Sequence, residues 1–173
     1  MHYDLTQIKN PQTKSFLEQF FKHRRINMDF YERVPEAEFD FRMINTPSRK
    51  SDSPRESLIH QIYVTRKYIY GITTSTLKFD GVTPKKLKNP QKMTKQELLT
   101  ELDNTGQELV DLLKQSDFDS KTVNVPWDKK PISAISCLEG LSNHEILHTG
   151  WNLPIMDHLD MKRFDSLCDM YGN

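Results

Sequence analysis

Two histidines one helical turn apart, His144 and His148, are the residues of this chain whose type and spacing point most directly to chemistry. They belong to a stretch in which one face recurs in steps of three and four residues: Cys137, Leu141, His144, His148, Trp151 and Ile155. This spacing predicts that both imidazoles point inward from one helix, about 6 Å apart along its axis. Two neutral imidazoles placed in this way can bind one divalent cation, and the alternative is a pair of hydrogen-bonded core histidines.

The run from His144 to His148 also spells H-E-x-x-H, the zinc-protease pattern in which the glutamate is the general base. The rest of that pattern is missing. Trp151 and Pro154 occupy the positions where the extended form has glycine and histidine, and no glutamate follows Glu145 to act as a third ligand. The missing positions therefore argue against a zinc protease. Glu145 is the only nearby candidate for a catalytic base, and the alternatives are that it faces solvent or supports another residue.

A third metal ligand has to come from elsewhere in the fold, and three further histidines are candidates. His158 lies ten residues beyond His148, about 15 Å along the same helix axis, which is too far to share an ion. His23 belongs to a basic run that is typical of a solvated face. His60 is then left, although the apolar stripe of its own helix does not bury it, so spacing alone leaves its role open.

The elements that must position these residues are predicted to be helices. Hydrophobic periodicity indicates four long helices and a short one, over about residues 12–33, 54–72, 95–115, 132–159 and 163–171. Two of them begin with a capping box, formed by Ser53 with Glu56 and by Thr94 with Glu97. The connectors are long, and the apolar connector over residues 118–127 is expected to pack on the bundle as a short extended piece.

Composition narrows the class of protein. The 24 basic residues balance the 24 acidic ones, so there is no positive excess for binding nucleic acid. The sequence contains no run of eighteen apolar residues, so no membrane span is predicted, and the first residues do not resemble a signal peptide. Cys137 and Cys168 are interpreted as packing residues rather than a redox pair. We therefore expect one cytoplasmic domain over residues 1–173, with no nucleic-acid or membrane partner.

Taken together, these features resemble the DinB/YfiT-like superfamily. The resemblance rests on the run Ser53 to His60 in the second helix, on Val125-Pro126-Trp127 in the connector, and on the run Asn143 to Gly150 in the fourth helix. It covers most of the chain. It implies an all-α fold, a four-helix bundle with long connectors and a short C-terminal helix.

The resemblance also implies a metal site. Its ligands would be His60, His144 and His148, and the ion a divalent metal, usually zinc or nickel, at one end of the bundle. One departure concerns the second motif histidine, which many members follow with Arg-Gly-Gln, whereas Thr149-Gly150-Trp151 follows His148 here. The pocket wall is therefore expected to differ. Pro154 is expected to kink the fourth helix just beyond the site.

Two kinds of reaction follow from the resemblance. Some relatives use the metal to activate a low-molecular-weight thiol for S-transfer or isomerisation, and others are described as metal-dependent hydrolases. We favour a thiol S-transferase that acts on a small-molecule substrate, because no second carboxylate-rich ligand set indicates a two-metal hydrolytic site. A non-catalytic, metal-stabilised stress or interaction module is the competing class.

The first and third predicted helices have more apolar residues than one narrow line of helix–helix contact would bury. We therefore expect a homodimer that covers the excess apolar surface. The alternative is that this surplus packs under the 118–127 connector. The residues concerned are Phe16, Phe20, Phe21, Phe30, Leu98, Leu99, Leu102 and Leu109.

Overall fold

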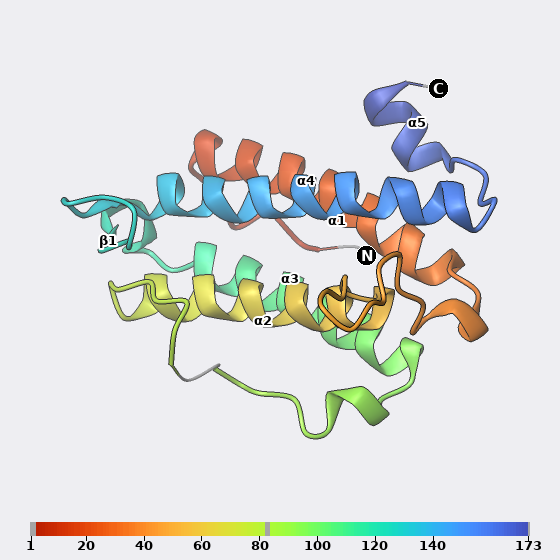
Figure 1. The fold of residues 1–173 in the computed structure, drawn as a ribbon. Helices are drawn as coiled ribbons and strands as arrows, with labels where there is room; N and C mark the ends of the chain where they lie inside the picture. Colours follow the sequence, from red (N-terminus) through yellow and green to blue (C-terminus); the bar gives the residue numbers. More distant parts are fainter. Residues whose placement is uncertain (1–2, 82–83, 173) are drawn as a thin grey trace.

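The computed structural model describes residues 3–81 and 84–172, and its long helices run side by side (Figure 1). The helices are α1 Pro11–Arg33, α2 Pro54–Thr73, α3 Lys95–Leu113, α4 Ala134–His158 and the short α5 Asp165–Tyr171. The α1 helix packs chiefly on α4 and α2 chiefly on α3, and contacts of α2 with α4 and of α1 with α3 close the bundle. The prediction of an all-α four-helix bundle is confirmed. Single turns of 3-10 helix lie in the connectors at Glu36–Glu38, Pro90–Lys92 and Phe118–Ser120.

The helix starts are set by local capping, which is why the sequence predicted them closely. The Asn10 side chain accepts hydrogen bonds at the first turn of α1. Both predicted capping boxes are present, at Ser53 for α2 and at Thr94 for α3. The start of α2 matters most for function, because it fixes the turn of the helix on which His60 lies.

The fourth helix begins two residues later than predicted. Residues Ile132–Ser133 form strand β2, which pairs antiparallel with β1, Thr122–Val123. Ser133 then caps α4, its hydroxyl accepting a hydrogen bond from the backbone N–H of Ser136. The apolar connector is thus a short ribbon that packs on the bundle, as its composition indicated.

The apolar surplus on α1 and α3 is covered by the chain itself. Phe20 and Leu109 share a core cluster with Phe118, Val123 and Val125 of the connector. Most of the surface that led us to expect a homodimer is therefore buried within one chain, although Phe16 and Phe21 are only partly buried, and the homodimer itself stays a prediction. Of the eight residues concerned, the fully or nearly fully buried ones are Phe20, Phe30, Leu98, Leu99, Leu102 and Leu109.

A buried polar layer separates two apolar core clusters along the bundle. At its centre Arg24 of α1 forms a salt bridge with Glu145 of α4, with 2.6 Å between the nitrogen and oxygen and both side chains fully buried. The basic run around His23 predicted a solvated face, and for Arg24 that interpretation is wrong. Arg24 is buried because it donates hydrogen bonds inward, to Thr65 of α2 and Thr105 of α3 as well as to Glu145.

Among the described residues, no helix combines the length and apolar character that a membrane crossing needs.

Candidate metal centre

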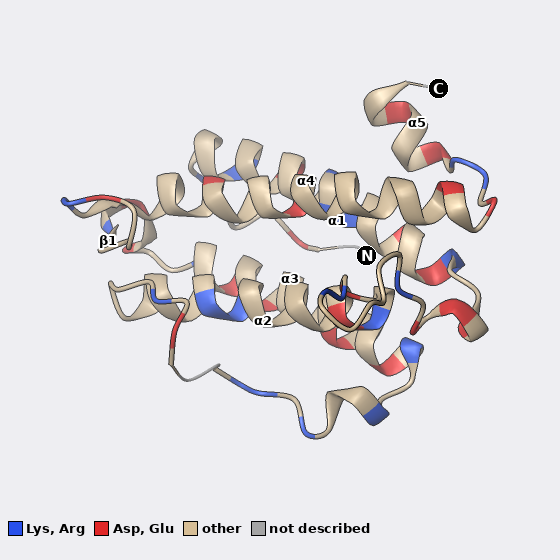
Figure 2. Ribbon diagram, in the orientation of Figure 1, with Lys and Arg blue, Asp and Glu red and all other residues tan. Residues whose placement is uncertain are grey.

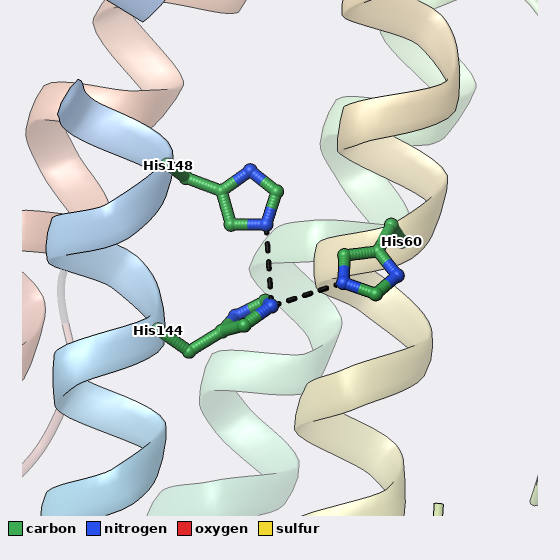
Figure 3. Close-up of side chains that lie close together, drawn as sticks. All are labelled: His60, His144 and His148. Carbon is green, nitrogen blue, oxygen red and sulfur yellow. Dashed lines mark hydrogen bonds between the residues drawn. The ribbon is translucent and has the colours of Figure 1, made fainter. Parts of the chain in front are cut away.

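Three histidine rings converge between α2 and α4 (Figure 3). The Nε2 atom of His144 lies 3.0 Å from Nε2 of His60 and 3.3 Å from Nε2 of His148. One nitrogen from each ring lies within 4.8 Å of the other two, a spacing that suits ligands of one metal ion. The structure thus brings together the three residues that the sequence singled out. The two α4 histidines lie near the middle of that helix, at the level of the polar layer, and not at an end of the bundle.

All three rings are held in their neutral form. Burial is the main cause: it lowers the pKa of His148 to about 2 and that of His144 to about 4, and it also lowers the pKa of the more exposed His60. The neighbouring imidazoles act in the same direction on His144 and His148. Neutral imidazole is the form of histidine that binds metal ions, so protons do not compete for these nitrogens at neutral pH.

The orientation of the His148 ring is fixed through Nδ1, the ring nitrogen that does not face the other two histidines. Its Nδ1 atom lies 2.8 Å from the hydroxyl oxygen of Ser57, which also accepts a hydrogen bond of 3.0 Å from the Tyr31 hydroxyl. Burial raises the pKa of Tyr31, so its hydroxyl remains a proton donor. With the proton on Nδ1 donated to Ser57, the Nε2 lone pair of His148 faces the other two rings.

The donor set fits a divalent metal ion. Nitrogen lone pairs as close as these repel one another unless a proton or a cation lies among them. Binding through Nε2 places the proton of the neutral His144 ring on Nδ1, which is buried without a hydrogen-bond partner among the described residues. Three neutral imidazoles match the ligand preferences of zinc and nickel.

Glu145, the candidate base, does not face this cluster. Its Oε1 accepts from Arg24 at 2.6 Å, and its Oε2 accepts from Asn27 at 2.9 Å and from Gln61 at 3.3 Å. Both oxygens are therefore engaged by buried donors of α1 and α2. A general base has to reach the proton that it removes, and this carboxylate reaches none in the pocket. These contacts favour the supporting role that was the alternative to catalysis, and the catalytic role itself stays a prediction.

The other two histidines considered from the sequence lie outside the cluster. The Nδ1 atom of His23 lies 3.1 Å from the Tyr171 hydroxyl. His158 stacks on Phe41, with 4.7 Å between the ring centroids. Neither belongs to the group of nitrogens that can share an ion.

The histidines line a pocket of about 200 Å³ between α2 and α4. Trp151 was predicted to point inward, but it is 45% exposed and forms part of the pocket wall. At about 100° per residue it lies at the edge of the inward face, on the side of the half-buried His144. Sequence reasoning missed Asp52, Ser57 and Leu147, because only the packing of α2 against α4 brings them here. The lining residues are Asp52, Ser57, His60, His144, Leu147, His148 and Trp151.

Comparison with known proteins identifies one family. A family model described as the DinB superfamily matches residues 19–151, which include most of α1, all of α2 and α3, and α4 as far as Trp151. The matched segment contains His60, His144 and His148. A search of curated proteins found no match.

Proposed function

The chain belongs to the DinB superfamily, and from this premise we propose that it holds one divalent metal ion on His60, His144 and His148. We further propose that it activates a low-molecular-weight thiol for transfer to a small-molecule substrate. The observation that supports this most strongly is the convergence of three Nε2 atoms from two helices. Zinc or nickel is the expected ion.

The three ligands also define the electrostatics of the site. A divalent ion, when bound, lowers the pKa of a thiol or water beside it. Neutral imidazoles leave the full charge of the ion in place, which makes this effect large. Ser57 and Tyr31 keep the His148 ring in its binding orientation, and Leu147 and Trp151 form an apolar part of the pocket wall.

The environments of two carboxylates, Glu145 and Asp52, favour thiol transfer over hydrolysis. A hydrolase benefits from a positioned base that accepts a proton from the attacking water. Glu145 is occupied by Arg24, Asn27 and Gln61, and Asp52, the one carboxylate among the described lining residues, is exposed. A thiol whose pKa is lowered to near neutrality attacks as the thiolate and needs no such base.

Metal content tests the first half of the proposal. Elemental analysis of protein purified without a histidine tag should find about one equivalent of transition metal per chain. His60→Ala should lose most of it, whereas His158→Ala, a change in a histidine outside the cluster, should retain it. Less than about a tenth of an equivalent, even after reconstitution, would contradict the metal site.

Turnover tests the second half. The metal-loaded protein should consume a thiol in the presence of an electrophile, and this activity should be absent in His60→Ala and present in His158→Ala. Activity on an ester panel instead would identify a hydrolase. Metal binding without turnover in either screen would favour the non-catalytic module.

A further inference from the structure

The walls of the histidine pocket differ in character, and this difference bears on which thiols it accepts. We infer that the pocket selects small thiols with an uncharged, apolar tail and disfavours acidic thiols, with Trp151 as the side chain that binds the tail. This inference rests on the proposed thiol chemistry and names the substrate class within it.

The apolar wall is formed by Leu147 and Trp151. Leu147 is 65% exposed and Trp151 45% exposed, so each presents apolar surface that no other described residue covers. Each lies three residues after a histidine of the cluster, on the same side of α4 as that histidine. A ligand atom held at the imidazoles therefore has these two side chains beside it. Burying their surface, and stacking a ring on the indole, stabilises a bound apolar tail.

The charge of the pocket lining disfavours thiols with acidic tails. Among the described lining residues Asp52 is the one with a formal charge, and neither lysine nor arginine is present. The nearby Arg42 is held by Glu56 and by the backbone carbonyl of Ser51. Along α4 the sole charge between Glu139 and Asp157 is the buried Glu145, so the helix is largely uncharged in Figure 2. A carboxylate at the far end of a tail, beyond reach of the ion, would meet repulsion from Asp52 with no lysine or arginine of the described lining to balance it.

The size of the pocket limits the ligand further. About 200 Å³ is less than the ~300–1,000 Å³ that drug-sized ligands occupy. The pocket therefore accepts a small thiol, or the thiol end of a longer one, with its tail lying against the α4 wall.

Thiol binding to Co²⁺-loaded protein tests the inference without using turnover. Dissociation constants are measured from the change in visible absorption for phenylmethanethiol, 2-mercaptoethanol and 4-(mercaptomethyl)benzoate, whose rigid ring keeps the carboxylate away from the ion. We expect phenylmethanethiol to bind about tenfold more tightly than 2-mercaptoethanol, a ratio that corresponds to the upper range of aromatic stacking. The acidic thiol should bind more weakly than phenylmethanethiol, from which it differs only by the carboxylate.

Variants assign the preference to its residues. Trp151→Ala should reduce the tenfold ratio to about twofold, whereas Trp151→Phe should retain most of it. Trp127→Ala is the matched control, since Trp127 is 53% exposed but does not line the pocket. Asp52→Asn should raise the affinity for 4-(mercaptomethyl)benzoate alone, and Asp169→Asn, an exposed position on α5, should not.

The possible outcomes separate the two proposals. If Co²⁺ binds but none of the three thiols alters its absorption, the proposed thiol function fails. If thiols bind but Trp151→Ala keeps the full preference of the unmodified protein, or the acidic thiol binds as tightly as the apolar one, the present inference fails and the thiol function stands.

Discussion

Replacing Glu145 by glutamine tests whether this residue supports the fold or takes part in catalysis. The substitution keeps the shape of the side chain but removes the charge that faces Arg24, 2.6 Å away in a fully buried pair. It also turns one acceptor into an NH₂ group near the amide donors of Asn27 and Gln61. Removing one partner of a buried ion pair costs about 3–5 kcal/mol, because the remaining charge is left uncompensated.

This cost is large enough to measure directly. For a chain of this length each kcal/mol lowers the melting temperature by about 2–4 °C, so Glu145→Gln should lower it by about 6–20 °C. Urea unfolding at pH 7 should show the loss of about 3–5 kcal/mol in the free energy of unfolding. The control is Glu139→Gln, an exposed glutamate of the same helix, which should change that free energy by less than about 0.5 kcal/mol.

Two further measurements separate support from catalysis. Under saturating metal, Glu145→Gln should still bind about one equivalent, because the carboxylate does not line the pocket. Combining it with Arg24→Met should recover part of the lost stability, since the unpaired buried charge is then gone. A Glu145→Gln protein as stable as the unmodified chain but without turnover would refute this reasoning and make Glu145 a catalytic residue.

Three other predictions follow from the site. Ser57→Ala and Tyr31→Phe should each weaken metal affinity about 10–100-fold, measured against a chromophoric chelator, whereas unchanged affinity would mean that the hydrogen bonds behind His148 are dispensable. Without metal, the free energy of unfolding should decrease as the pH is lowered from 6.5, by up to about 1.4 kcal/mol per pH unit for His148. Burial lowers the pKa of His148 to about 2, so only the unfolded chain takes up the proton in this range. Urea titrations at pH 7, 6 and 5 would show this slope, and His148→Gln should reduce it, with the contributions of His144 and His60 remaining. Chelation of the metal-loaded protein should lower its melting temperature by about 5–11 °C if metal had been present at 100 times its dissociation constant, and should leave the melting of His60→Ala unchanged.

The features that the sequence predicted well depend on neighbouring residues. The α2 and α3 starts follow from the capping boxes at Ser53 and Thr94, which close over four residues. The pairing of His144 with His148 follows from one helical turn. His60 could be added only through the family resemblance, because its own helix pattern leaves it exposed.

The features that were missed depend on contacts between distant segments. Arg24 and Glu145 are 121 residues apart, and the basic run around Arg24 indicates solvent when taken by itself. Asp52 and Leu147 share a pocket only because α2 packs on α4. Local periodicity contains no information on such contacts, so neither the buried ion pair nor the character of the pocket wall could be predicted.

The buried ion pair also accounts for how α4 presents its histidines. This helix is apolar around much of its circumference, and Ile146, Leu147 and Trp151 are exposed at different angles around it, so hydrophobic burial alone does not fix its rotation. Glu145 lies between the two histidines in sequence and points into the bundle, toward Arg24. A rotation of α4 that turned its histidines away from His60 would also separate Glu145 from Arg24 and leave two buried charges unpaired. The polar layer thus couples the stability of the bundle to the geometry of the three-histidine cluster.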